Sequence, residues 1–209
     1  DKSEEIKEDM TEKMIQHIYQ LVPGERDIES LNTVIGDSTF AGIDPTGLED
    51  PTRWQSIVSS ADAELKFYSG ATGYSLAEAI NAATFNDERP TLIITTEEIF
   101  TGIEEYQEYK RRVNRDNQLI DMGYDNIKFK GIPIVSDKRC PAGYMFGINE
   151  DCLELVVDPD YDMSLTKWEK HEKYPNALFK AMSWAGNFRT DKRHTHFKLS
   201  GITSVETPA

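Results

Sequence analysis

Residues 75–109, SLAEAINAATFNDERPTLIITTEEIFTGIEEYQEY, decide the class of fold, because they hold a helix, a strand and a second helix in close succession. Ser75 and Glu78 have the spacing of a capping box, which predicts a helix that runs to about Phe85. Its buried face is expected to consist of Leu76, Ala79, Ile80 and Ala83. After Pro90, residues 91–95 are β-branched and apolar enough to form a strand that is covered on both faces.

The second helix of this block is expected to begin after Thr96, whose side chain is a candidate cap. Glu97 and Glu98 lie in its first turn, where the helix dipole favours acidic residues. Its buried face is predicted to hold Ile99, Phe100, Ile103 and Tyr106. A strand between two such helices indicates an α/β or α+β layer in which helices cover a sheet.

The flanking regions extend this pattern in both directions. Residues 4–22 repeat apolar side chains at about every fourth position, which predicts one amphipathic helix that Pro23 and Gly24 end. Residues 25–70 are rich in turn-forming residues and are expected to form extended segments and turns. Further strands are predicted at residues 127–130, 132–136, 144–148 and 153–157, the last one half buried, and two long strands at residues 177–185 and 193–202 around Gly186 and Asn187.

The composition excludes several classes of protein. Of the 209 residues, 38% are hydrophobic and 29% are charged, which is too apolar for a disordered chain and too polar for a membrane protein. The formal net charge is −14, and the first 100 residues hold 20 of the 37 acidic residues but only 7 of the 23 lysines and arginines. Phosphate backbones and anionic lipids repel such a chain, so we expect neither a nucleic-acid-gripping role nor a membrane partner.

No residue pattern indicates a catalytic, cofactor or metal site. Cys140 and Cys152 have no CxxC partner and no histidine pair at zinc spacing, so they are expected to be structural free thiols. His194 and His196 have a spacing that metal sites use on a strand, but their basic neighbours favour a solvated basic strand. The acidic turn at residues 158–162 lacks the glycine and the distant glutamate of a calcium loop. The sequence also contains no phosphate-binding, nucleophile-elbow or zinc-protease motif, so we expect no enzyme.

One local reversal of charge lies near the C-terminal end of the sequence. It consists of Arg189, Lys192, Arg193, His194, His196 and Lys198. One interpretation is a charged strand edge that discourages aggregation. The other is a salt-bridging surface that faces an acidic neighbour, with the acidic first half of a second copy as the obvious partner. On the second interpretation, the candidate inter-subunit contacts are Arg189, Lys192, Arg193 and Lys198.

A series of short motifs resembles a family of tailed-bacteriophage major capsid proteins, and the motifs occur in the family's order. They are residues 35–44, residues 89–96 (RPTLIITT), residues 129–137 (FKGIPIVSD), residues 140–149 (CPAGYMFGIN), residues 153–155 (LEL), residues 184–187 (WAGN), Arg193, and residues 199–202 (LSGI). The resemblance thus spans most of the chain.

The resemblance implies the Hong Kong 97 (Johnson) fold, an α+β capsid fold with a spine helix, an elongated β-sheet peripheral domain and an α/β axial domain. By this resemblance, residues 1–48 belong to the peripheral domain and contain the spine helix. Residues 49–150 form the axial domain, and residues 151–209 supply strands that return through both domains. The family has no active site, so the resemblance assigns no catalytic residue.

The function that the resemblance implies is a structural subunit of an icosahedral head of a phage or prophage. Such subunits self-assemble into pentamers and hexamers and enclose double-stranded DNA without sequence-specific binding. Scaffold, portal and decoration proteins are further candidate partners, and the expected location is the virion, after assembly in the cytoplasm of a host bacterium. Two alternatives stay open: an encapsulin-like nanocompartment shell, and a small acidic enzyme with a metal at His194 and His196.

Overall fold

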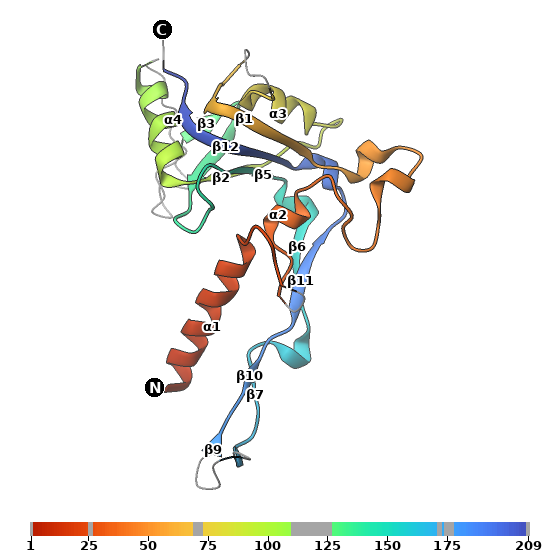
Figure 1. Ribbon diagram of the computed structural model, residues 1–209, viewed down its shortest axis with the longest axis vertical. Coiled ribbons are helices and arrows are strands. Elements are labelled where there is room, and N and C mark those ends of the chain that lie inside the picture. Colours follow the sequence, from red (N-terminus) through yellow and green to blue (C-terminus); the bar gives the residue numbers. More distant parts are fainter. Residues whose placement is uncertain are drawn as a thin grey trace.

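The structure is a computed structural model, and it describes residues 2–24, 27–68, 73–109, 127–170, 173 and 178–207. A six-stranded sheet with its helices forms one end, and helix α1 (Lys2–Ile18) and a two-stranded arm project from it (Figure 1). The other helices are α2 (Leu31–Val34), α3 (Leu76–Ala82) and α4 (Glu97–Tyr109). The 3-10 turns are η1 (Pro45–Gly47), η2 (Pro51–Trp54), η3 (Glu150–Cys152), η4 (Pro159–Tyr161) and η5 (Arg193–Thr195).

The sheet is mixed, with the strand order β1-β12-β5-β2-β4-β3. Its strands are β1 (Ile57–Leu65), β2 (Leu92–Thr95), β3 (Ile127–Phe129), β4 (Ile132–Ser136), β5 (Met145–Ile148) and β12 (Phe197–Val205). The pairs β1–β12 and β2–β4 are parallel, and the other pairs are antiparallel. The chain leaves this sheet after β5, forms the arm, and returns to it as β12.

Helices α3 and α4 cover one face of the sheet, as the pattern of residues 75–109 predicts. The predicted faces of both helices are buried, and Ile93 and Phe197 pack against them from the sheet with no exposed surface. The capping box is confirmed, because the Glu78 backbone N–H donates to Ser75 Oγ and the Ser75 N–H donates to Glu78 Oε2. The predicted cap by Thr96 is wrong, because its buried hydroxyl has no hydrogen-bond partner among the described residues.

The opposite face of the sheet carries a second, smaller core. Successive side chains of a strand point to opposite faces of the sheet. In β2 and β5, Ile94 and Phe146 are among those that point into this second core. Leu31 and Ile35, at and after α2, and Tyr19, beyond the end of α1, pack there. Tyr19 also donates its hydroxyl proton to Asp137 Oδ2 at 2.9 Å, so it joins the end of α1 to the sheet.

The predicted helix at residues 4–22 is confirmed as an element, but its end is wrong. Helix α1 ends at Ile18, and the next turn is tightened by bonds from the N–H groups of Tyr19 and Gln20 to carbonyls three residues earlier. The side-chain amide of Asn32 then donates to Leu21 O at 2.8 Å. Tyr19 follows the last residue of α1 and is held in the second core by its bond to Asp137, so the helix does not continue to Val22.

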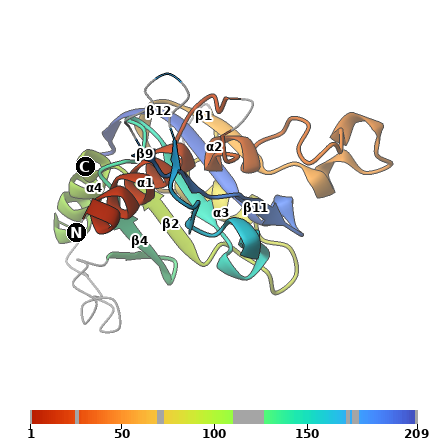
Figure 2. The same cartoon turned by 90° about the horizontal axis from the view of Figure 1, so that it is seen from below.

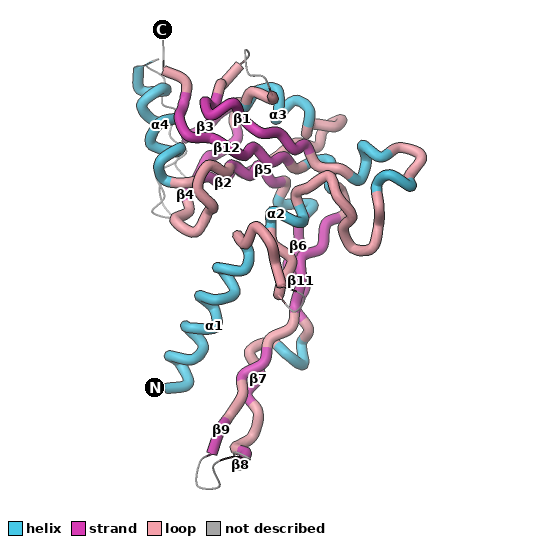
Figure 3. The backbone as a smooth tube through the Cα atoms, viewed as in Figure 1, coloured by secondary structure: helices cyan, strands magenta, loops and turns pink. Residues whose placement is uncertain are grey.

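The arm is a ribbon of paired antiparallel strands, seen at the lower end of Figure 3. Its pairs are β6 (Leu153–Val157) with β11 (Gly186–Thr190), β7 (Ser164–Leu165) with β10 (Met182–Ser183), and β8 (Glu169–Lys170) with β9 (Leu178–Phe179).

The ribbon corrects the prediction of two long C-terminal strands, of which Ala177 lies outside the described residues. Gly186 and Asn187 form part of β11 and not a turn, and Arg193 lies in a 3-10 turn before β12. The predicted strand at residues 153–157 is confirmed as β6. It is more exposed than predicted, since only one other strand pairs with it.

A loop between α2 and β1 projects to the side of the sheet, where Figure 2 shows it at the right in orange. The prediction of extended segments and turns for residues 25–70 agrees with β1 and with the turns η1 and η2, but it missed the short helix α2. Asp44 and Asp50 cap these two turns, each by accepting a bond from the N–H two residues later. The hydroxyl groups of Thr46 and Thr52 also donate to these carboxylates, and these side-chain hydrogen bonds, with the backbone bonds, lower the pKa of both carboxyl groups.

Candidate interaction surfaces

Arg193 lies inside the protein and cannot contact a neighbouring subunit in this structure. Its guanidinium group donates to Val34 O at 2.7 Å, Ser38 O at 2.6 Å and Thr33 O at 2.9 Å, and to Trp54 O at 3.2 Å. These carbonyls belong to the last turn of α2 and to both ends of the projecting loop. Burial of the charge lowers the pKa of Arg193. The residue therefore fixes the base of the loop, which corrects its predicted role.

Of the other three candidate contacts, only Arg189 is largely exposed. Lys192 forms an ion pair with Glu88. Lys198 is half-buried and donates to Asn32 Oδ1 at 3.0 Å and to Asn32 O at 3.1 Å. Arg189, on β11, keeps 63% of its side chain exposed and pairs with Asp191 at 3.1 Å. The basic run is thus used mainly within the chain, and Arg189, Lys192 and Lys198 stay proposed inter-subunit contacts.

The two histidines do not share the face of a solvated strand, so that prediction is wrong. His196 is completely buried, and its Nδ1 accepts from the Asn149 N–H at 3.0 Å while its Nε2 lies 3.2 Å from Thr190 Oγ1. Because Nδ1 is an acceptor, the proton is on Nε2, and burial lowers the pKa of His196 to about 4. With both ring nitrogens occupied, His196 cannot also bind a metal together with His194.

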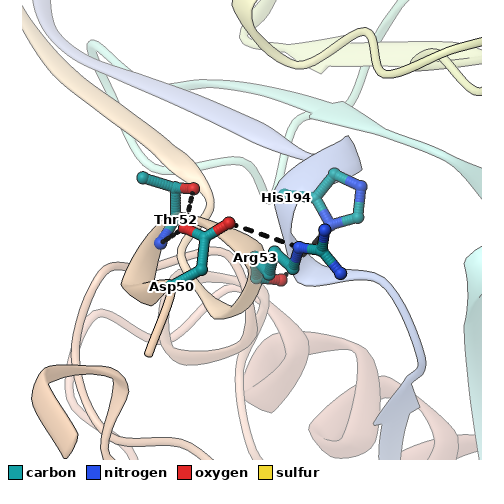
Figure 4. Close-up of polar contacts among 4 residues, drawn as sticks. All are labelled: Asp50, Thr52, Arg53 and His194. Carbon is teal, nitrogen blue, oxygen red and sulfur yellow. Dashed lines mark hydrogen bonds and ion pairs between the residues drawn. The ribbon is translucent and has the colours of Figure 1, made fainter. Parts of the chain in front are cut away.

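His194 lines a small cavity at the base of the projecting loop (Figure 4). The cavity has a volume of about 240 Å³, and Asp50, Thr52 and Arg53 lie on its loop side. His194 Nδ1 lies 3.2 Å from Arg53 O, and the ring meets Phe85 edge-on. No group of three histidine, cysteine or acidic side chains in the described part of the chain could hold a metal ion.

Both cysteines are free and buried, which agrees with the prediction of structural thiols. Burial raises the pKa of Cys140 to about 12 and also raises that of Cys152. A thiol with a raised pKa carries little thiolate near neutral pH and is a poor nucleophile. The environment of both cysteines thus favours a packing role.

The arm exposes many large apolar side chains. Half of the large apolar residues that are exposed in the described ranges belong to it: Leu155, Val156, Tyr161, Leu165, Trp168, Leu178 and Phe179. Trp168 is 64% exposed and Leu178 is 60% exposed. A two-stranded ribbon has no second layer that could cover such residues. A cluster of exposed apolar side chains of this kind indicates a surface for another protein.

Helix α1 is also incompletely covered. A groove of about 400 Å³ separates it from the root of the arm, and Met10, Met14, Ile28 and Trp184 are among the residues that line it. The helix touches the sheet part mainly near its end, through Ile18 and the neighbouring Tyr19. Among the described residues, no helix is long and apolar enough to cross a bilayer.

The sequence patterns did not reveal the arm as an interaction surface, because motifs and runs of charge are the signals that point to sites. Short strands separated by polar residues are typical of a covered sheet as well as of an isolated ribbon. The available signal was the spacing of aromatic and lysine residues at positions 165–180, in a segment whose strands are too short to form a layer of their own.

Comparisons with known proteins establish the fold. No protein-family model matches this sequence, and no curated protein sequence does. Among solved structures, the chain is similar to a subunit of the cyanophage A-1(L) capsid, with a TM-score of 0.64 and 21% identity over 93% of this chain and 66% of that one. It is also similar to the encapsulin of the holo-SrpI complex from Synechococcus elongatus PCC 7942, with a TM-score of 0.56 and 12% identity over 97% of this chain and 65% of that one.

A third solved structure, a satellite phage P4 procapsid that includes a size-determination protein, aligns with a TM-score of 0.46 and 11% identity over 97% of this chain and 62% of that one. The chain therefore spans less than two thirds of the length of each of these proteins. The first two matches confirm the predicted α+β fold of the Hong Kong 97 type, which phage capsid subunits and encapsulins share.

Proposed function

We propose that this chain is a structural subunit of an icosahedral phage head, which self-assembles into pentamers and hexamers and encloses double-stranded DNA. The observation that carries the proposal is the alignment of 93% of the chain with a cyanophage capsid subunit. The uncovered arm and the partly uncovered α1 support it, because a shell subunit needs projecting surfaces that other copies cover.

The division of the chain follows from the same proposal. The six-stranded sheet with its helices corresponds to the axial domain, and α1 with the arm corresponds to the peripheral domain. The boundaries at residues 48 and 150 remain predictions. In this arrangement the chain acts by assembly, without catalysis, and its place is the virion after assembly in the host cytoplasm.

On this proposal, the inner surface of the shell encloses the DNA duplex without binding it tightly. A net charge of −14 repels phosphate, so enclosed DNA would slide along the shell rather than stick to it. Scaffold, portal and decoration proteins remain candidate partners that the same shell surfaces would meet.

An encapsulin-like compartment is the second candidate, and the alignment of 97% of the chain with an encapsulin favours it. The two candidates differ in cargo. A phage head holds DNA, whereas a compartment shell of this kind encloses protein. Absorbance of purified particles at 260 and 280 nm therefore separates the two.

The test of the proposal is the mass of the purified chain by light scattering on a sizing column, with negative-stain imaging of the same peak. Rings or closed shells are the expected result. A chain that stays monomeric at every protein concentration would contradict assembly as its function. Particles that hold DNA only through tight, salt-sensitive binding would contradict the proposed non-adhesive inner surface.

A further inference from the structure

The tip of the arm, defined here as residues 164–170 and 178–183, is basic although the chain as a whole is acidic. Lys167, Lys170 and Lys180 are exposed, and none of them forms an ion pair with another described residue. The Lys180 ammonium group lies 5.2 Å from the centre of the exposed Trp168 ring. The tip thus offers cations next to apolar surface, a combination that suits an acidic protein surface with apolar residues in it.

Helix α1 carries a surface of this kind. Glu5, Glu8, Glu12 and Ile15 follow the spacing i, i+3, i+7 and i+10, so they form one stripe along the helix. The three glutamates are exposed and have no ion pair with the rest of the described chain, and Ile15 is half-buried. We call these four residues the acidic stripe.

The tip and the acidic stripe of one chain cannot meet each other. Met10 and Met14 line the groove between α1 and the root of the arm, and helix geometry places the acidic stripe on the opposite side of α1. Figures 1 and 3 show the helix and the arm diverging from the sheet. A contact between the two surfaces therefore requires two copies.

Both surfaces lie at the same end of the molecule. The N-terminal end of α1 and the tip of the arm both point away from the six-stranded sheet (Figure 1). Copies that approach each other at this end bring the tip of one toward α1 of the next. A contact between two different surfaces of identical chains is heterologous, and it can close a ring.

We propose that the arm tip of one copy binds the acidic stripe on α1 of a neighbouring copy, with Lys167, Lys170 and Lys180 facing Glu5, Glu8 and Glu12. Trp168 and Leu178 of the tip are covered in this contact beside Ile15 of the partner copy. The inference rests on the proposed shell function and names the surfaces that would join its subunits. Because charge pairs guide the approach of the two surfaces, assembly should weaken as the salt concentration rises.

The experiment is a charge-exchange cycle on the full chain. One variant changes Lys167, Lys170 and Lys180 to Glu, and a second changes Glu5, Glu8 and Glu12 to Lys. The protein concentration at which half of the chain is assembled is measured by sedimentation velocity. Each variant alone is expected to raise this concentration by about tenfold or more, and their combination should return it to within about threefold of the starting protein.

The matched control has the same net charge as the combined variant, but its three glutamate-to-lysine changes lie on another helix. It joins the lysine changes with Glu97→Lys, Glu98→Lys and Glu105→Lys on α4, whose side chains are also exposed. This variant should not be rescued. Equal rescue by both combinations would show a general effect of charge and would overturn the proposed contact, as would normal assembly of either single-site variant.

Two further outcomes distinguish this contact from nucleic-acid binding at the tip and from a chain that does not assemble. If the lysine variant assembles normally but loses binding to a DNA duplex, the tip contacts nucleic acid and the proposal is wrong. If the unchanged chain never assembles, the shell function fails and the contact fails with it, whereas intact assembly without the rescue pattern removes only the contact. Should a Glu or Lys triple variant misfold by circular dichroism, the matching Gln variants replace it, with an expected rise of about threefold.

Discussion

In the six-stranded sheet, Ile93, Phe197 and Leu199 have no exposed surface, whereas in the arm Trp168 and Leu178 expose 64% and 60% of theirs. The two regions use similar residues but reach opposite results. The sheet has helices on one face and a second core on the other, so its large apolar side chains meet another layer. The arm consists of strand pairs, and no third strand joins any of these pairs among the described residues. Whether apolar side chains are buried within one chain therefore depends on the number of packed layers. The apolar side chains of the arm stay exposed and are available for contact with a partner.

The difference predicts where a substitution affects folding and where it affects assembly. Changes in the sheet and at the base of the projecting loop should lower the free energy of unfolding. Changes in the arm should leave this free energy nearly unchanged and should act on association.

Arg193→Met should lower the free energy of unfolding by about 3–5 kcal/mol, because it leaves four carbonyl groups at the base of the loop without their shared donor. The measurement is urea unfolding followed by circular dichroism. Arg189→Met is the matched control on the arm, where the guanidinium group is exposed, and its effect should stay within about 0.5 kcal/mol. Equal effects of the two substitutions would mean that Arg193 does not hold the loop.

Two leucines allow the same substitution to be made in both regions. Leu199→Ala, on β12, should cost about 2–5 kcal/mol through lost burial and the cavity that remains. Leu178→Ala, on β9, should cost less than about 0.5 kcal/mol, since the side chain is mostly in water already. Thermal unfolding of both variants checks the prediction. A cost of about 2 kcal/mol or more for Leu178→Ala would show that the tip is packed within its own chain.

The sequence predicted the sheet region well for a physical reason. Residues 75–109 contain caps, periodic apolar faces and a β-branched strand, and all of these signals are local. The buried faces of α3 and α4 and the strand β2 follow from them directly. The end of α1 was wrong because a long-range bond, from Tyr19 to Asp137, overrides the local pattern that continues to Val22.

The candidate contacts could not be predicted in the same way. The sequence shows that residues 189–198 are basic, but it does not show which charges turn inward. Arg193 is buried because the carbonyl groups that hold it come from residues about 140–160 positions earlier in the chain. The basic tip was overlooked because its lysines are spread among aromatic residues and glutamates and do not form a continuous run.

His196 should make the sheet region sensitive to acid. Its pKa is about 4 in the folded chain and about 6.5 in an unfolded one, so the unfolded chain takes up a proton first as the pH falls. The stabilising effect is complete above pH ~6.5 and is lost progressively as the pH falls toward ~4, up to about 3 kcal/mol in all. Urea unfolding at several pH values, compared with His196→Gln, isolates this part. If the two proteins lose stability in parallel, His196 does not cause the loss.

Two serines, one in each region, allow a further comparison, in which small changes in the free energy of unfolding are expected. Ser75→Ala removes the side-chain half of the capping box on α3 and should cost about 1 kcal/mol of global stability. Ser164→Ala removes the bond between the Ser164 and Ser183 hydroxyl groups, 2.8 Å apart across β7 and β10, and should change global stability by less than about 0.5 kcal/mol.

Ser164→Ala should instead speed amide hydrogen exchange in β7 and β10, because a two-stranded ribbon opens without unfolding the sheet. The comparison has a further consequence if the arm tip binds a neighbouring copy. In the assembled state a third element covers the ribbon, so exchange in β7 and β10 should slow for the unchanged chain while exchange in β2 and β5 stays the same. Slowing in both regions would mean that assembly stabilises the whole chain. The sheet and the arm would then not differ in how much their stability depends on a neighbouring copy.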